Sequence, residues 1–188
     1  HKEEQQLDLA EKDEKFLDRH ILFRKKLFLE SIEGAILRIS ADDYYKLYIN
    51  GKFVTMGPAP SYPQCYNYNE IDVTPYLTLG ENTFAVHTYY QGLINRVWVS
   101  ADRRQMLWFD LSVGGKTVAV SDRSWKCAEH SGYSAVRRIG HEVQFMECYD
   151  SRAVEKSFFA PDFDDSAWES ASVYENADYT LVRQTTEQ

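Results

Sequence analysis

Among the side chains of this sequence, the carboxylates are the best candidates for catalysis. Glycoside hydrolysis needs two carboxyl groups about 5–9 Å apart, and acids occur here in four local groups. These groups are Asp42-Asp43, Glu70 with Asp72, Glu147 with Asp150, and Asp162 with Asp164 and Asp165. Short acidic side chains are also typical of turns and caps. We therefore interpret all four groups as turn or cap residues, with calcium or sugar contact as the second interpretation and catalysis as the third.

Other catalytic and metal-binding motifs do not occur in the sequence. It contains no Gly-x-Ser-x-Gly elbow, no His-Glu-x-x-His pair and no phosphate loop. The five histidines are scattered without the spacing of metal ligands: His1, His20, His87, His130 and His141. Each is therefore expected at the surface or as a hydrogen-bonded core residue. We predict no catalytic residue, no metal ligand and no cofactor for this chain, and no complete calcium ligand set is found.

The three cysteines, Cys65, Cys127 and Cys148, lie far apart and form no Cys-x-x-Cys pair. This pattern indicates neither a disulfide scaffold nor a structural zinc site. We expect three buried thiols. A bridge between Cys127 and Cys148 is the alternative, because both lie in strand-like segments.

Aromatic residues with polar neighbours favour carbohydrate binding. Aromatics make up 14% of the chain, with thirteen Tyr and four Trp, and flat rings can stack on a sugar while amides and Arg contact its hydroxyls. Two windows, 62–69 and 89–98, combine these types. The candidate sugar contacts are Tyr62, Tyr66, Asn67, Tyr89, Tyr90, Gln91, Asn95, Arg96 and Trp98. The alternative interpretation is that these rings fill the core, because Tyr and Trp are good strand formers.

The elements that must position these residues are predicted to be short antiparallel strands. Asn50-Gly51 separates two alternating segments and predicts a type I′ hairpin, and Gly114-Gly115 predicts a second one. Strands are expected at 23–29, 35–41, 45–49, 52–54, 70–73, 83–90, 107–113, 116–120, 144–149 and 170–173. The proline-rich segment 57–63 and most of 122–141 are expected to be loops. The predicted fold is all-β, an antiparallel β-sandwich of the jelly-roll kind.

Length and charge limit the organisation and the partners. With 188 residues the chain has room for one domain and a short extension. We expect a charged, helical or frayed lead-in at 1–19, the sandwich at 20–175 and a tail or linker at 176–188. The net charge of −8 argues against nucleic acid and anionic membranes as partners, and no segment has the roughly 20 apolar residues of a membrane span. We expect a cytoplasmic protein, with export as the alternative because the chain starts at His1 and not at Met.

Seven segments together resemble a known family. They are ISADDYYKLYINGK at 39–52, GPAP at 57–60, IDVTPYL at 71–77, GEN at 80–82, SDRSWK at 121–126, YDSR at 149–152 and DFDDSAW at 162–168. In this order they are similar to the N-terminal β-sandwich of bacterial α-L-rhamnosidases of glycoside hydrolase family 78. The first segments also recur in galactose-binding-like jelly rolls of other glycosidases. The resemblance covers about 23–173.

This resemblance implies an accessory domain that lies before a catalytic (α/α) barrel in the same polypeptide. The family's catalytic acid and base lie in that barrel, so the resemblance assigns no catalytic residue to this chain. The expected role is to pack on that barrel and to help hold a rhamnose-containing glycan. Some related modules bind rhamnose through a calcium ion held by Asp or Asn side chains and backbone oxygens, and this sequence matches no complete set of such ligands. The alternatives are a purely structural module without sugar binding, a jelly roll from another glycosidase family, and a hydrolase that acts through its own carboxylate pair.

Overall fold

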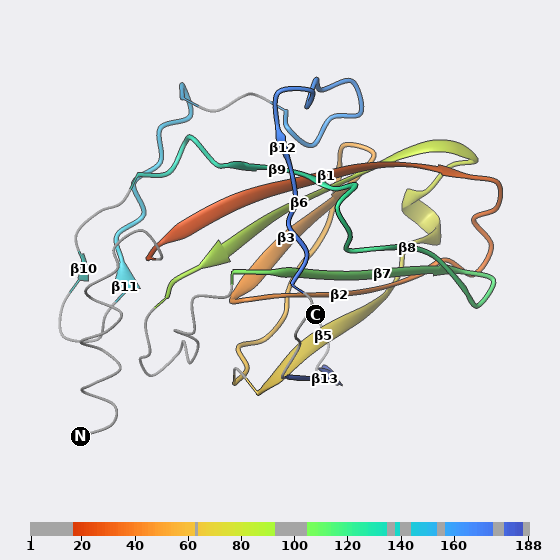
Figure 1. Ribbon diagram of the computed structural model, residues 1–188, viewed down its shortest axis with the longest axis horizontal. Helices are drawn as coiled ribbons and strands as arrows, with labels where there is room; N and C mark the ends of the chain where they lie inside the picture. Colours follow the sequence, from red (N-terminus) through yellow and green to blue (C-terminus); the bar gives the residue numbers. More distant parts are fainter. Residues whose placement is uncertain are drawn as a thin grey trace.

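Two β-sheets packed face to face form the protein (Figure 1). The computed structural model describes residues 17–62, 64–92, 105–134, 138–139, 144–153, 157–174 and 179–185. The predicted all-β sandwich is confirmed. The described residues contain one short 3₁₀ turn, Thr74–Tyr76, and no helix among them is long and apolar enough to span a bilayer.

The first sheet has six strands in the order β12-β9-β1-β6-β3-β4. Their bounds are β1 Arg19–Leu29, β3 Tyr44–Ile49, β4 Lys52–Gly57, β6 Gly80–Tyr90, β9 Lys126–Glu129 and β12 Glu169–Ser170. Strands β1 and β6 pair antiparallel along their full length, from Arg19 opposite Tyr90 to Leu29 opposite Gly80. This long pair forms the centre of the sheet.

The second sheet has five strands in the order β13-β5-β2-β7-β8. Their bounds are β2 Ile36–Ala41, β5 Cys65–Asp72, β7 Leu107–Val113, β8 Lys116–Val120 and β13 Thr180–Arg183. Strand β13 lies parallel to β5, and all other pairs are antiparallel. A separate small pair joins β10 Arg138–Ile139 to β11 Gln144–Phe145.

Both predicted hairpins are confirmed. Their turn residues have positive φ angles, which Asn and Gly tolerate better than other residues. Asn50 and Gly51 have φ values of 51° and 81° between β3 and β4, and Gly114 and Gly115 have values of 55° and 76° between β7 and β8. Positive φ at both central positions is the requirement of a type I′ turn. Asn50 adds a side-chain hydrogen bond to Asn82 Oδ1 at 2.8 Å, which ties the hairpin to the start of β6.

The hydrophobic core lies between the two sheets. Side chains at alternate positions point inward, as in β2 and β3, where Leu37, Ile39, Leu47 and Ile49 are fully buried. Since successive side chains of a strand point to opposite faces, the residues between them lie on the outer faces. Whether a residue of a strand is at an inward or an outward position therefore determines whether its side chain can take part in a site on the outer face.

The outer face of the six-stranded sheet is covered by chain that follows β9. We call the described residues 130–134, 144–153 and 157–168 the cover. Here Leu22 and Ala85 form a second apolar cluster with Phe158 and Trp168 of the cover, separate from the core between the sheets. In Figure 1 residues 157–168 of the cover lie above β1, and residues 144–153 lie at the left, beside the start of β1.

Several local expectations need correction. Strand β9 lies within 122–141, which we expected to be mostly loop, because it gains pairing on both sides from β1 and β12. Strand β5 begins at Cys65, inside the first aromatic window. Part of the expected tail forms β13. The segments predicted at 144–149 and 170–173 form only the two-residue strands β11 and β12.

The thiols also differ from expectation. All three cysteines are free, so the alternative of a Cys127–Cys148 bridge is wrong. Cys65 and Cys127 are half-buried and Cys148 is exposed, so the expectation of three buried thiols is wrong as well. Burial raises the pKa of the Cys127 thiol, which keeps it in the less reactive protonated form.

Candidate functional site

The first aromatic window does not form an open sugar site. Its three candidate side chains have separate environments. Tyr62 is 67% exposed, and the Asn67 side chain donates to the carbonyl oxygens of Ala59 and Pro60. Tyr66 is 1% exposed, and its hydroxyl donates to Asp42 Oδ2 at 3.0 Å. Tyr66 therefore has no surface for a sugar, which corrects its place among the candidates.

The second aromatic window, 89–98, also contains both buried and partly exposed side chains. Tyr90 and Gln91 are 1% and 0% exposed, so neither side chain can make the direct sugar contact that we expected. The Gln91 backbone N–H donates to Asp43 Oδ2 at 2.7 Å, which fixes the end of β6. Tyr89 is half-buried on the outer face of its sheet. Asn95, Arg96 and Trp98 lie outside the described residues.

Tyr89 belongs to a recess of about 160 Å³ at the end of the six-stranded sheet. Its walls come from β1, β3, β6 and the cover. They are Asp18, His20, Tyr44, Tyr89, Gln91, Tyr133, Ser134, Phe145, Met146, Glu147 and Cys148. Pairing places Tyr89 opposite both His20 and Tyr44, so three rings from three adjacent strands line up on one face.

The rings of the recess hold one another in place. The His20 ring stacks on Tyr133 with a centroid distance of 3.6 Å and an interplanar angle of 7°. Tyr89 lies 4.6 Å from His20 and 5.1 Å from Tyr44, both tilted. Burial raises the pKa of Tyr44 and of Tyr133 to about 12 and also raises that of Tyr89. All three hydroxyls therefore keep their protons and can donate hydrogen bonds at neutral pH.

Two carboxyl groups face these rings. Asp18 accepts a hydrogen bond from the Tyr89 hydroxyl at 3.1 Å, and its backbone N–H donates to the Gln91 carbonyl. Burial raises the pKa of Asp18, and the charge of Glu147 raises it further against the lowering effect of Tyr89. The recess thus combines phenol donors with carboxyl acceptors around aromatic faces. No group of three or more His, Cys, Asp or Glu side chains suited to a metal ion occurs among the described residues.

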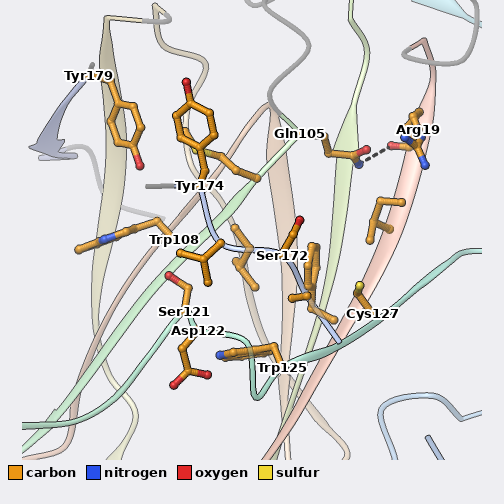
Figure 2. Close-up of a pocket in the computed structure, with 16 residues that line it drawn as sticks. Arg19, Gln105, Trp108, Ser121, Asp122, Trp125, Cys127, Ser172, Tyr174 and Tyr179 are labelled. Carbon is orange, nitrogen blue, oxygen red and sulfur yellow. Dashed lines mark hydrogen bonds between the residues drawn. The ribbon is translucent and has the colours of Figure 1, made fainter. Parts of the chain in front are cut away.

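A larger cavity of about 520 Å³ lies between the two sheets, close to β1 and β7 (Figure 2). Its lining includes Phe23, Trp108, Trp125, Val173 and Tyr174, and it is mainly apolar. None of the six predicted sugar contacts within the described residues lines it. Residues 171–174 cross its mouth, and Tyr174 is 55% exposed there.

Sequence reasoning named Tyr89 and Gln91 among the residues around the recess, although the Gln91 side chain has no exposed surface there. It missed the other walls. Asp18 falls in the segment expected to be a charged lead-in, and Tyr133 falls in a predicted loop. Tyr44 lies beside the Asp42-Asp43 pair, and Glu147 was interpreted as a turn residue. The alternation in 44–49 could have shown that Tyr44 shares a face with Lys46, but no local pattern relates Asp18 to Glu147.

Comparison with known proteins agrees with this fold. The family model described as the α-L-rhamnosidase N-terminal domain matches residues 30–188. The glycoside hydrolase family 78 rhamnosidase of Bacillus sp. GL1 is similar with 29% identity and a TM-score of 0.79, over 89% of this chain and 18% of that one. The α-L-rhamnosidase of Aspergillus terreus is 25% identical with a TM-score of 0.66, over 87% of this chain and 20% of that one.

A third similar structure is that of Streptomyces avermitilis α-L-rhamnosidase complexed with L-rhamnose, which is 22% identical with a TM-score of 0.69. The match covers 89% of this chain and 17% of that one, and this similarity supports the fold alone. Among curated protein sequences, none matches. The chain spans about a fifth of the length of the rhamnosidases described above. Because the family model matches most of its residues, the chain belongs to the α-L-rhamnosidase N-terminal domain family.

Proposed function

We propose that this chain is a non-catalytic accessory domain of an α-L-rhamnosidase-like glycoside hydrolase, and that it holds one sugar ring of a rhamnose-containing glycan in the recess. The observation that carries the proposal is the meeting of three tyrosines with Asp18 and Glu147 at one end of a sheet. Because the similar enzymes are rhamnosidases, L-rhamnose is the first ligand to test.

The chemistry of the recess fits a neutral sugar. Sugar hydroxyls both donate and accept, so they can donate to the Asp18 and Glu147 carboxyl groups and accept from tyrosine hydroxyls. The aromatic faces of Tyr44 and Tyr133 can pack on the C–H groups of the ring. A volume of about 160 Å³ is below the roughly 300 Å³ at which drug-sized pockets begin. It therefore suits a single ring and not a longer chain.

Isothermal titration of the purified chain with L-rhamnose at neutral pH tests this proposal. We expect heat at millimolar sugar and a several-fold loss of affinity in Glu147→Gln, because a charge-assisted acceptor becomes neutral. Glu169→Gln, an exposed acid on β12 outside the recess, is the matched control and should bind as the unchanged chain does. Absence of heat, or an equal loss in both variants, would contradict the proposal.

The second part of the proposal is that the domain packs on a catalytic domain of the same polypeptide. The mouth of the cavity supports it, since Val173 and Tyr174 expose apolar surface beside Trp108. Such surface is typical of an interface. In the longer polypeptide, Tyr174→Lys should lower the unfolding temperature, whereas in the isolated chain it should change little. Equal effects in both would contradict packing at this surface.

The alternative of a purely structural module predicts packing without sugar binding. It is favoured if titration gives no heat while Tyr174→Lys still destabilises the longer polypeptide. The remaining alternative is a hydrolase that acts through its own acids. The isolated chain should release no nitrophenol from an aryl rhamnoside, and measurable release that Glu147→Gln abolishes would establish that alternative.

A further inference from the structure

Three histidines lie together where the cover meets the six-stranded sheet. His20 of β1 and His87 of β6 approach with Nδ1 and Nε2 3.0 Å apart. The ring of His130, at the start of the cover, lies 4.9 Å from that of His87. We call these three residues the histidine cluster. Tyr133 of the cover contacts all three rings, so the cluster is the contact through which this end of the cover is held.

The hydrogen bonds of the cluster need neutral acceptor rings. Between His20 Nδ1 and His87 Nε2 one nitrogen donates and the other accepts with its lone pair, so at least one of these two rings is neutral. His130 also accepts with Nδ1 from the backbone N–H of Gly132 at 3.2 Å. Protonation of His130 at that nitrogen would replace this acceptor by a donor and would leave two N–H groups facing each other. A second proton on the His20–His87 pair, or a proton on His130 Nδ1, would therefore break one of these bonds.

The charged and titratable groups around the cluster come from every element packed against it. They are Asp18 next to β1, Arg19 of β1 with Glu129 of β9, Tyr44 and Lys46 of β3, Tyr89 of β6, and Tyr133, Glu147 and Tyr149 of the cover. Asp18 bonds to Tyr89 and Glu129 pairs with Arg19. Lys46 lies opposite His87 in the sheet and adds positive charge. Among the residues that the structure describes, no hydrogen bond or ion pair joins a carboxylate to any of the three rings.

Burial of the three rings also disfavours their protonation. It is the first cause that lowers the pKa of His20 to about 3 and that of His87 to about 2, with mutual repulsion and Lys46 as further causes. Burial also lowers the pKa of His130. In an opened cover each ring would return toward the ordinary value of about 6.5.

We propose that the histidine cluster is an acid-sensitive latch for the cover, so that proton uptake releases residues 130–134 and 144–150 from the sheet while the sandwich stays folded. Other backbone bonds at this end are few among the described residues. His130 N–H donates to the His20 carbonyl of β1, and release of the cover would break this bond. Ser134 N–H donates to the Cys148 carbonyl and Asp150 N–H to that of Gly132, so these two segments of the cover hold each other.

The latch controls the proposed sugar recess. His20 and Tyr133 form one of its walls, and Ser134, Glu147 and Cys148 form another. Release of the cover would remove Tyr133, Ser134, Glu147 and Cys148 from these walls and leave the residues of β1, β3 and β6. This consequence rests on the proposed function, but the latch does not. We expect the affinity for L-rhamnose to fall below about pH 6 if both are correct.

Hydrogen exchange of the unliganded chain at about pH 7 and pH 5, corrected for intrinsic exchange rates, tests the latch without any sugar. Each histidine that is freed on opening raises the opening equilibrium about 25-fold between these pH values. The amide of His130, which donates to the His20 carbonyl of β1, should lose protection by at least that factor. The amides of Ala160, Phe163 and Trp168, which are bonded within the other end of the cover, and those of β2 should keep theirs.

Two variants sharpen the test. His20→Gln and His87→Gln each keep a neutral polar side chain and remove one titrating group, so each should reduce the pH effect by about 25-fold. Equal loss of protection at both ends of the cover, unchanged protection at His130 at pH 5, or an undiminished pH effect in both variants would overturn the proposal. If neither variant folds, the comparison of the two ends of the cover in the unchanged chain decides alone.

Discussion

The two ends of the cover are attached to the same sheet face by different chemistry. At one end Arg24 of β1 is completely buried and donates to Asp165 Oδ2 at 2.9 Å, to the carbonyl oxygens of Phe158, Ala160 and Phe163, and stacks over the Phe163 ring. At the other end the histidine cluster lies against Tyr133. Arg24 and His20 are only four residues apart on one strand.

The difference shows how one strand can supply both a fixed and a pH-dependent attachment. A guanidinium is charged throughout the physiological pH range, and here its donors are matched by carbonyl and carboxylate acceptors. An imidazole changes charge near neutrality, and the hydrogen bonds of the cluster need neutral acceptor rings. The recess lies at the pH-dependent end and not at the fixed end.

The largest effect is expected at the fixed end. Arg24→Leu removes the cation and leaves Asp165 and three carbonyl oxygens without their donor. Loss of one partner of a buried ion pair costs about 3–5 kcal/mol. We expect a decrease of about 3 kcal/mol in the free energy of unfolding, measured by urea denaturation at neutral pH. A loss below about 1 kcal/mol would mean that Arg24 does not anchor the cover.

The next effect is the dependence of stability on pH. Between pH 6.5 and about 3 the unfolded chain binds protons at His20 and His87 that the folded chain does not, because their folded pKa values are lower. Stability from these groups is complete above pH 6.5 and falls as the pH decreases, by about 1.4 kcal/mol per pH unit for each histidine. Urea denaturation at several pH values measures the slope. In Arg24→Leu the slope of the free energy of unfolding against pH should be unchanged. A changed slope would show that the two ends of the cover are energetically coupled.

Tyr133→Leu should have a smaller effect and a different signature. It removes the ring that stacks on His20 but keeps an apolar side chain at the base of the cover. Aromatic pairs contribute about 0.5–1.5 kcal/mol beyond burial, so we expect a loss of about 1 kcal/mol. Hydrogen exchange should locate the weakening at Ser134 and Asp150 and not at Phe163. Equal weakening at Phe163 would contradict independent attachment.

The smallest effect is expected from an exposed ion pair within the cover. Arg152 pairs with Asp150 at 2.8 Å, but its side chain is 89% exposed. Solvent screens such pairs, and most contribute little. Arg152→Ala should leave the urea midpoint unchanged within error, so a clear decrease would show that surface charge also attaches the cover.

The sequence predicted the features of this fold that depend on neighbouring residues. Asn50-Gly51 and Gly114-Gly115 specify hairpins through their tolerance of positive φ, and alternating side chains specify sheet faces. Strand β9 escaped prediction because its pairing with β1 joins residues about a hundred positions apart, as in Phe23 opposite Cys127. Strand β13 gains its partner β5 over a similar distance.

The candidate site was predicted only in part for the same reason. Tyr89 was found because aromatic and amide residues cluster around it in the sequence, but Tyr66 and Tyr90 in equally aromatic windows are buried. Composition identifies the residue types that bind sugars, whereas the register of each strand determines whether a ring faces a recess or the core. Glu147 reaches the recess from the cover, whose path no periodicity specifies.

The most direct test of the account is a titration of the chain, labelled with carbon-13 in its tyrosine rings, with L-rhamnose at neutral pH. Signals of Tyr44, Tyr89 and Tyr133 should shift together with one affinity, while that of the fully buried Tyr45 of the core should stay constant. Absence of any shift at millimolar L-rhamnose, or shifts confined to tyrosines outside the recess, would contradict a sugar site at this end of the sheet.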